Sequence, residues 1–223
     1  MTDFLNSFIT YWPEWSPRLF RAMANTALIS VFGFVLASVS GTVLALCLTS
    51  RIAALRLSAR AYVGFFRGVP LLVVLFLIYF GLPGIGLVFD AIPTAIVGLG
   101  LCFAAQMAEV VRAGFLAIPK GQSEAAAAVG FTPAQTFFSI ILPQVLRVIA
   151  APIVITFVSL LKDSSLASLI TVKELILEGR ALSTEYFLPL QIFMCVGALY
   201  FLIAFPLSLL ARGLARRADP NRR

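Results

Sequence analysis

The stretch Glu124–Pro143, EAAAAVGFTPAQTFFSIILP, separates hydrophobic segments with residues that end and begin helices. Gly130 predicts the end of a short helix, because glycine readily adopts the left-handed backbone conformation common at helix C-termini. Thr132 offers an N-cap hydroxyl, and Pro133 suits the first turn of a second helix. The pattern therefore predicts two helices joined at a sharp corner, with Pro143 closing the unit before the next hydrophobic segment.

The composition around this stretch is that of a membrane protein. Of the 223 residues, 61% are hydrophobic and only 12% are charged. Long charge-free runs approach or exceed the roughly 20 residues that cross a bilayer core. They predict one all-α transmembrane domain over residues 1–223, with five transmembrane helices at about 19–48, 61–82, 91–116, 140–161 and 187–210. Polar residues and prolines in 125–146 predict an interfacial loop, spanning residues 120–143, rather than a sixth transmembrane helix.

The net charge of +7 follows the topology rather than a nucleic-acid site. With five spans and the N-terminus outside, twelve of the seventeen basic residues, including Arg222 and Arg223, fall on the cytoplasmic side, and seven of the ten acids fall outside. Basic residues favour cytoplasmic loops, so the orientation predicted is N-out and C-in, with the lipid bilayer and not nucleic acid as the partner. The absence of histidine and of CxxC predicts no metal site.

Seven positions in the quoted stretch resemble the EAA loop found in permease subunits of type I ABC importers. The spacing is Glu-Ala-Ala, three residues, Gly, nine residues and Ile-x-Leu-Pro, filled by Glu124, Ala125, Ala126, Gly130, Ile140, Leu142 and Pro143. The resemblance implies a cytoplasmic coupling helix that docks on a separate ATP-binding subunit, where ATP and Mg²⁺ would bind. The alternative is an amphipathic interfacial helix with chance spacing.

A second segment is similar to the polar amino-acid branch of this superfamily. The run FFRGVPLLVVLFLIYFGLP, residues 65–83, resembles the signature RGTPLLVQLFLIYFGLP, with Val69 and Val74 replacing the usual Thr and Gln. Arg67 and Pro70 then lie at the inner end of the second span, as structural or gating candidates. Arg67 is interpreted as a topology anchor at the membrane surface, with a gating role as the alternative.

The third span carries a group of polar residues near its inner end. Glu109 and Arg112 are three residues apart and share a helical face, which predicts an ion pair with a structural role. The run AEVVRAG again resembles the amino-acid branch, which usually has Tyr where this chain has Gln106. Gln106 is therefore a candidate residue of the substrate path.

Lys162, Asp163 and Ser164 begin a segment that resembles the KDTSL box of the same branch. Adjacent Lys and Asp side chains would suit a zwitterionic amino acid, one for each charged group; the alternative is an interfacial ion pair that contributes little. Ile155 and Thr156 occupy positions where the branch often has Asn and an acid or Gln, which argues against a cationic substrate. Thr156 either faces the ligand or bonds to its own helix.

Two segments near the predicted outer side have alternative interpretations. Residues 1–17, with Trp12 and Trp15, predict an aromatic segment at the outer interface. The polar stretch 171–185 is either a docking surface for an extracytoplasmic substrate-binding protein or a solvated loop. Small residues at Ser30, Gly33, Ala37 and Gly41 allow close helix packing, either within the chain or with a second subunit.

The chain is expected to be a transport subunit and not an enzyme. No G-x-x-x-x-G-K-[S/T] phosphate loop is present, so ATP hydrolysis requires a separate chain. Five spans enclose little space, which predicts association with a second permease subunit, identical or different. An ion-coupled secondary transporter is the alternative, although the chain shows no internal repeat. An intramembrane enzyme would need a base near Ser164, and only Lys162 is adjacent.

Overall fold

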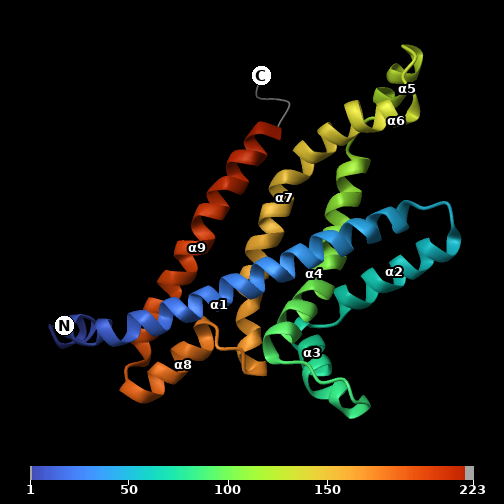
Figure 1. Cartoon of the computed structure of the whole chain (residues 1–223). Coiled ribbons are helices and arrows are strands. Elements are labelled where there is room, and N and C mark those ends of the chain that lie inside the picture. The colour runs from blue at the N-terminus through green and yellow to red at the C-terminus, as the bar shows by residue number, and fades with distance from the viewer. Residues whose placement is uncertain (1, 219–223) are drawn as a thin grey trace.

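The computed structural model describes residues 2–218, and every regular element in that range is helical (Figure 1). Arg222 and Arg223, which contributed to the predicted orientation, lie outside the described residues. The elements in chain order are α1 (Thr2–Thr49), α2 (Ala53–Gly68), α3 (Leu71–Phe76), η1 (Leu77–Gly81), η2 (Leu82–Ile85), α4 (Ala91–Leu116), α5 (Gly121–Ala128), α6 (Pro133–Gln135), η3 (Thr136–Ile141), α7 (Leu142–Asp163), η4 (Ser164–Ile170), α8 (Leu175–Tyr186) and α9 (Pro189–Ala218).

Four helical stretches in the described residues are long and apolar enough to cross a membrane. They are Asn6–Thr49, Ala91–Leu116, Pro133–Ile170 and Pro189–Arg217. A fifth crossing requires counting Ala53–Gly68 and Leu71–Ile85 together, although the two are bent by 103°. The all-helical class and the number of predicted spans agree with this arrangement, while several predicted boundaries do not.

The second span, predicted as one helix over 61–82, is broken. Helix α2 ends at Gly68, and Val69 has extended backbone angles of φ −98° and ψ 130°. Pro70 explains this break, because proline disfavours the helical conformation in the residue before it and donates no N–H. After Pro70 the chain continues as α3 in a new direction (Figure 1).

The longest helix, α1, packs closely across α4 through its small residues (Figure 1). A Cβ added at Gly41 would lie 2.6 Å from Cβ of Met107 and 2.8 Å from the carbonyl oxygen of Ala104. At Gly33, an added Cβ would lie 3.2 Å from Cβ of Leu99. The strip of small residues therefore serves packing within the chain, one of the two alternatives that the sequence left open.

The N-terminal segment, for which the sequence predicts an aromatic interfacial position over residues 1–17, is helical from Thr2 and packs on the protein. Helix α1 continues through Pro13 and Pro17. Trp15 is fully buried with Leu182 and Ile192, and its ring meets that of Tyr186 edge-on, with centroids 5.7 Å apart. The indole of Trp15 is thus buried against α8 and α9, whereas Trp12 of the same segment is 40% exposed.

The corner predicted within Glu124–Pro143 forms at Gly130 and Thr132, as the sequence indicates. Gly130 has φ +85°, and Thr132 caps α6 by accepting a hydrogen bond from the backbone N–H of Gln135 at 3.3 Å. The side-chain oxygen of Gln135 in turn accepts a hydrogen bond of 2.9 Å from the backbone N–H of Thr132, which completes a capping box.

Pro143, by contrast, does not close the unit. It lies in the first turn of α7, and the helical path from Pro133 to Ile170 is long and apolar enough to be one span. The π-helical turn η3, Thr136–Ile141, directly precedes it. A proline within a helix clashes with the carbonyl four residues earlier, and a π turn changes that local geometry. The predicted fourth span, 140–161, therefore begins earlier in the structure.

Candidate functional site

A cavity of about 820 Å³ opens between the end of α2, one face of α4 and α7. Along α4 its wall includes Cys102, Gln106, Glu109, Ala113 and Ala117, which recur at three- and four-residue intervals and so share one helical face. With a rise of about 1.5 Å per residue, this stripe extends roughly 22 Å, longer than a single amino acid. The shape is that of a path along α4 rather than a closed pocket.

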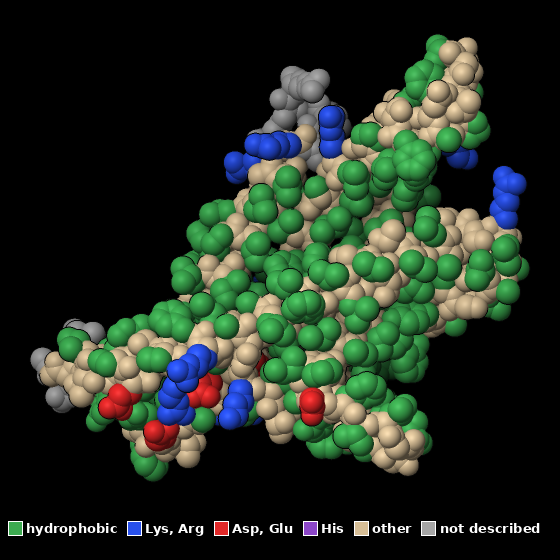
Figure 2. All heavy atoms as spheres, viewed as in Figure 1, with side chains coloured by type: hydrophobic (Ala, Val, Ile, Leu, Met, Phe, Trp, Pro, Cys, Tyr) green, Lys and Arg blue, Asp and Glu red, His purple; other side chains and the backbone are tan. Residues whose placement is uncertain are grey.

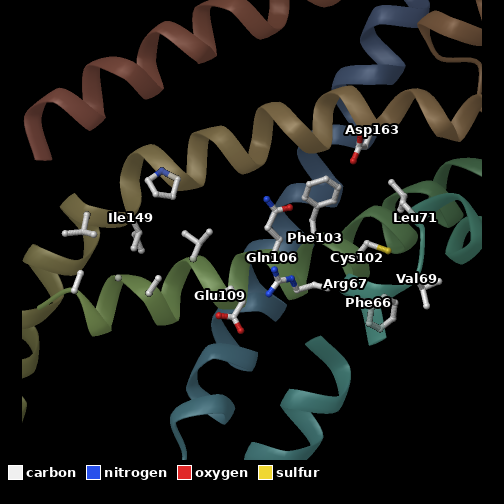
Figure 3. Close-up of a pocket in the computed structure, with 16 residues that line it drawn as sticks. Phe66, Arg67, Val69, Leu71, Cys102, Phe103, Gln106, Glu109, Ile149 and Asp163 are labelled. Carbon is white, nitrogen blue, oxygen red and sulfur yellow. The ribbon is translucent and has the colours of Figure 1, made fainter. Parts of the chain in front are cut away.

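Four chargeable or amide side chains give the cavity its polar lining. These are Arg67, Gln106, Glu109 and Asp163, all of them candidates from the sequence. Figure 3 shows Arg67 reaching from α2 toward Gln106 and Glu109 on α4, while Asp163 extends from α7 into the same space. Three separate segments of the chain therefore bring opposite charges to one cavity.

The break in the second span places Arg67 in this cavity. Arg67 is in the last turn of α2, one residue before the helix ends, and it is exposed. Within residues 2–218 it takes part in none of the ion pairs, which involve Arg18 and Arg112. The topology-anchor interpretation does not require a lining position. A position at the end of α2 suits a topology anchor, and a position on the cavity wall suits the alternative, a gating role.

Glu109 and Arg112 form the predicted ion pair. Nη2 and Nε of Arg112 lie 2.6 and 2.9 Å from Oε2 of Glu109. The two side chains are about one-third exposed, so the pair neutralises charge at the cavity wall without being removed from solvent. Glu109 lines the cavity, and its charge is compensated within the chain, which supports the structural role predicted for the pair.

Asp163 and Lys162 do not form the two-sign site that their adjacency suggested. Asp163 lines the cavity against α4, whereas Lys162 lines two hollows between α7 and α9. Adjacent residues on a helix point about 100° apart, because 3.6 residues complete a turn. The positive charge that shares the cavity with Asp163 is Arg67.

The two hydroxyl candidates are buried and outside the cavity lining. Ser164 is fully buried, and its Oγ donates a hydrogen bond of 2.8 Å to the carbonyl oxygen of Leu161. Thr156 is 1% exposed and is not among the lining residues, although it lies on the same face of α7 as Ile149, Pro152 and Asp163, which line the cavity. Sequence reasoning missed Phe103 and Cys102 as lining residues, because an apolar side chain in a span gives no signal of which neighbour it faces.

The EAA-like residues of α5 and the corner that follows it project at one end of the molecule (Figure 1). Glu124, Ala125 and Gly130 are exposed, whereas Ala126 is 2% exposed. Ile140 and Leu142 are half-buried where the corner joins α7, and Pro143 is exposed. The nearby Val129 is 73% exposed, a large apolar side chain beside a rigidly capped corner. Such a surface is suited to contact with another chain.

The polar stretch 171–185 is largely a helix rather than a loop. Arg18 of α1 pairs with Glu178 and Glu185 of α8, each at 2.6 Å. Glu174 is fully buried and caps α8: its carboxylate accepts bonds from the backbone N–H of Leu177 at 2.9 Å and the hydroxyl of Tyr200 at 2.8 Å. Burial raises the pKa of Glu174 above its ordinary value of 4.5 despite these bonds. Three acidic side chains of this stretch, Glu174, Glu178 and Glu185, therefore form hydrogen bonds or ion pairs within the chain.

Comparison with known sequences identifies the family. A model of the family described as binding-protein-dependent transport system inner membrane component matches residues 30–223. The L-cystine transport system permease protein TcyB of Bacillus subtilis is 36% identical over 211 residues, covering 94% of this chain and 88% of that protein. The probable glutamine ABC transporter permease protein GlnP of Bacillus subtilis is 41% identical over 156 residues, covering 68% and 71%.

Solved structures give the same result for the fold. The crystal structure of an amino acid ABC transporter with histidines matches with a TM-score of 0.83 and 28% identity, covering 95% of this chain and 97% of that one. An inward-facing methionine ABC transporter, MetNI, matches with a TM-score of 0.65 and 25% identity, covering 89% and 95%.

The chain therefore belongs to the inner membrane components of binding-protein-dependent transport systems. It is the membrane-spanning permease subunit of an ABC importer, a transport component rather than an enzyme. The family name places it in the inner membrane and implies two kinds of partner, an ATP-binding subunit and a substrate-binding protein. The ion-coupled secondary transporter, the alternative from sequence, is not supported.

Proposed function

We propose that the cavity between α2, α4 and α7 carries a polar, zwitterionic amino acid across the membrane. The observation that supports this most directly is the presence of Arg67 and Asp163 in one cavity, with the amide of Gln106 on its wall. A guanidinium suits the α-carboxylate and a carboxylate suits the α-ammonium. Relatives named for cystine and glutamine transport are consistent with a polar substrate.

The charge balance of the cavity favours a substrate without net charge. Glu109 is compensated by Arg112, which leaves one cation, Arg67, and one anion, Asp163, among the described lining residues. A substrate with an additional charge would place that charge in the cavity without a partner, which is costly inside a membrane. The amide of Gln106 can both donate and accept a hydrogen bond, and it therefore suits a polar side chain.

The exposed corner around Glu124 and Gly130 is the proposed coupling site. Helix α5 would dock on the separate ATP-binding subunit, where ATP and Mg²⁺ bind, and the continuous helix from Pro133 would transmit its movement to α7. On the face drawn in Figure 2, Lys and Arg lie near α5 and the C-terminal part of α9, whereas the opposite end carries Asp and Glu together with further Lys and Arg. Glu124 of α5 is an exposed acid at the basic end. This distribution supports the N-out and C-in orientation. A second permease subunit, identical or different, completes the membrane part.

The substrate proposal is tested by uptake into proteoliposomes that contain this permease, its ATP-binding subunit and its binding protein. We expect neutral polar amino acids to be taken up in preference to cationic ones, and Arg67→Gln to lower uptake about tenfold or more, the effect of losing one charge-assisted hydrogen bond. Arg216→Gln, in the last turn of α9 and outside the cavity lining, is the matched control. Unchanged uptake by Arg67→Gln would remove the cavity from the proposed path.

The coupling proposal is tested separately by co-purification from mildly solubilised membranes. Glu124→Lys reverses an exposed charge at the corner and is expected to lose the ATP-binding subunit while the permease still inserts. Arg51→Glu, an exposed charge reversal between α1 and α2, is the control and should retain it. Equal recovery of the ATP-binding subunit with wild type and Glu124→Lys would contradict docking through this corner.

A further inference from the structure

A groove between α7 and α9 lies on a side of α7 different from the cavity. It consists of two hollows of about 450 and 360 Å³ that share three lining residues, Lys162, Ser208 and Arg212. The transport proposal makes no use of this groove. Its two cations are notable because charged side chains between membrane-spanning helices are costly unless they have a partner.

The helix directions bring the two cations toward each other. Helices α7 and α9 run in opposite directions (Figure 1). Val158, Leu161 and Ala204 pack together between them. Long side chains on a helix lean toward its N-terminus. Lys162, near the end of α7, and Arg212, in the C-terminal half of α9, therefore lean toward one another along the groove, which explains why both line both hollows.

The charge of these two residues is not compensated in the described part of the chain. Neither takes part in an ion pair among residues 2–218, and the lining residues of both hollows include no Asp or Glu. Hydroxyl groups accompany the cations: Ser165 lines the larger hollow and Ser159 the smaller. Ser208 lines both, but its hydroxyl donates to the carbonyl oxygen of Ala204 at 2.9 Å. Two cations with hydroxyl donors form a site suited to an anion with several oxygen atoms.

The rest of the groove is apolar and open. Phe201 and Phe205 line the larger hollow and are 61% and 40% exposed, and Ile155 lines the smaller and is 55% exposed. On a membrane-spanning helix, exposed apolar side chains of this kind are suited to contact with hydrocarbon. A ligand that satisfies both parts of the groove has an anionic head and hydrocarbon chains.

We infer that the α7–α9 groove binds an anionic phospholipid of the surrounding bilayer. The phosphate lies between Lys162 and Arg212, and the acyl chains cover Phe201, Phe205 and Ile155. The lipid supplies the negative charge that the chain itself lacks at this position, and it fills the space between two helices. The site is independent of the substrate cavity, because no residue lines both.

The experiment uses native mass spectrometry on the permease purified together with its ATP-binding subunit from bacterial membranes. Wild type is expected to retain phosphatidylglycerol or cardiolipin, and the double variant Lys162→Gln/Arg212→Gln to retain at least fivefold less. Arg216→Gln/Arg217→Gln is the matched control. It also removes two cations, both from α9 and outside the groove lining, and should retain the lipid. Equal retention by the groove variant and wild type would overturn the inference.

A second measurement does not depend on the variant folding. The melting temperature of wild type in neutral detergent is followed while phosphatidylglycerol, phosphatidylcholine or inorganic phosphate is added. Of the three, only phosphatidylglycerol should raise the melting temperature. If inorganic phosphate raises it equally, the groove is a site for free anions and the lipid assignment fails. The assignment also fails if Ser208→Cys chains without other cysteines cross-link to each other in native membranes, because a second copy then covers the groove.

Discussion

Lys162 and Asp163 are neighbours in the chain but face different spaces: Asp163 lines the cavity against α4, and Lys162 lines the groove against α9. One helical step separates a residue of the proposed substrate path from one of the proposed lipid site. The adjacency that suggested a joint site for a zwitterion therefore does not bring the two charges into one space.

The first prediction compares these two neighbours directly. Asp163→Asn should lower amino-acid uptake by about 10- to 100-fold, because a hydrogen bond to a charged group contributes about 1.5–3 kcal/mol. Lys162→Gln should change uptake by less than about threefold, since its side chain does not reach the cavity. Initial uptake rates in proteoliposomes, at equal amounts of assembled complex, measure both. A larger loss with Lys162→Gln than with Asp163→Asn would contradict the separation of the two sites.

The second prediction concerns the crossing of α1 and α4. Gly41→Ala should lower the melting temperature of the purified permease, because the new Cβ would lie 2.6 Å from Cβ of Met107. Overpacking of this kind costs about 1–3 kcal/mol. The control is Gly64→Ala in α2, where an added Cβ meets no atom within 4 Å. That change should be neutral or slightly stabilising, since alanine favours a helix more than glycine does. Equal melting temperatures for the two variants would argue against the close crossing.

The third prediction concerns the ion pairs that hold α1 to α8. Arg18 meets Glu178, whose side chain is 16% exposed, and Glu185, which is 51% exposed. A double-mutant cycle with Arg18→Gln and Glu178→Gln should give a coupling energy of about 0.5–1 kcal/mol, since Arg18 is itself 36% exposed and solvent screens it. The same cycle with Glu185→Gln should give less. The coupling should also shrink in 1 M salt, and a salt-independent value would contradict an electrostatic origin.

The fold could be predicted from the sequence largely where local chemistry decides it. Gly130 and Thr132 specify a corner through backbone conformation and capping, and both act as the sequence indicates. Hydrophobic runs likewise indicated five crossings, including the one that the structure bends at Pro70. A hydrophobicity pattern does not show how neighbouring turns accommodate a proline. It therefore predicts neither the bend at Pro70 nor the continuation of the helix through Pro143.

The residues that line the cavity were only partly indicated by the sequence, since Thr156, Lys162 and Ser164 were also candidates for the substrate path and do not line it. Arg67, Gln106, Glu109 and Asp163 were all candidates, and all line one cavity. That Arg67 and Asp163 line the same cavity follows from α2 ending beside α4 and α7, a relationship between segments about 100 residues apart. Trp15 likewise depends on distant segments: the aromatic composition of residues 1–17 suggested the membrane interface, and the burial of Trp15 against α8 and α9 could not be read from it.

The fourth prediction uses the buried carboxyl of Glu174. Burial raises its pKa in the folded state above the ordinary value of 4.5, so the folded protein holds this proton more tightly than the unfolded chain does. The resulting stabilisation is fully present below pH of about 4.5 and is lost as the pH rises through the folded-state pKa. Glu174→Gln has no proton to lose. Its melting temperature relative to wild type should therefore increase from pH 4 to pH 8.

Tyr200→Phe provides the companion measurement. The hydroxyl of Tyr200 donates to Oε2 of Glu174 at 2.8 Å and so lowers the carboxyl pKa in opposition to burial. Without it the pKa of Glu174 rises further, and the loss of stability in this variant should extend to higher pH than in wild type. In the double variant Tyr200→Phe/Glu174→Gln this extension should disappear. A melting-temperature difference between Glu174→Gln and wild type that stays constant from pH 4 to pH 8 would show that Glu174 does not titrate differently in the folded and unfolded states.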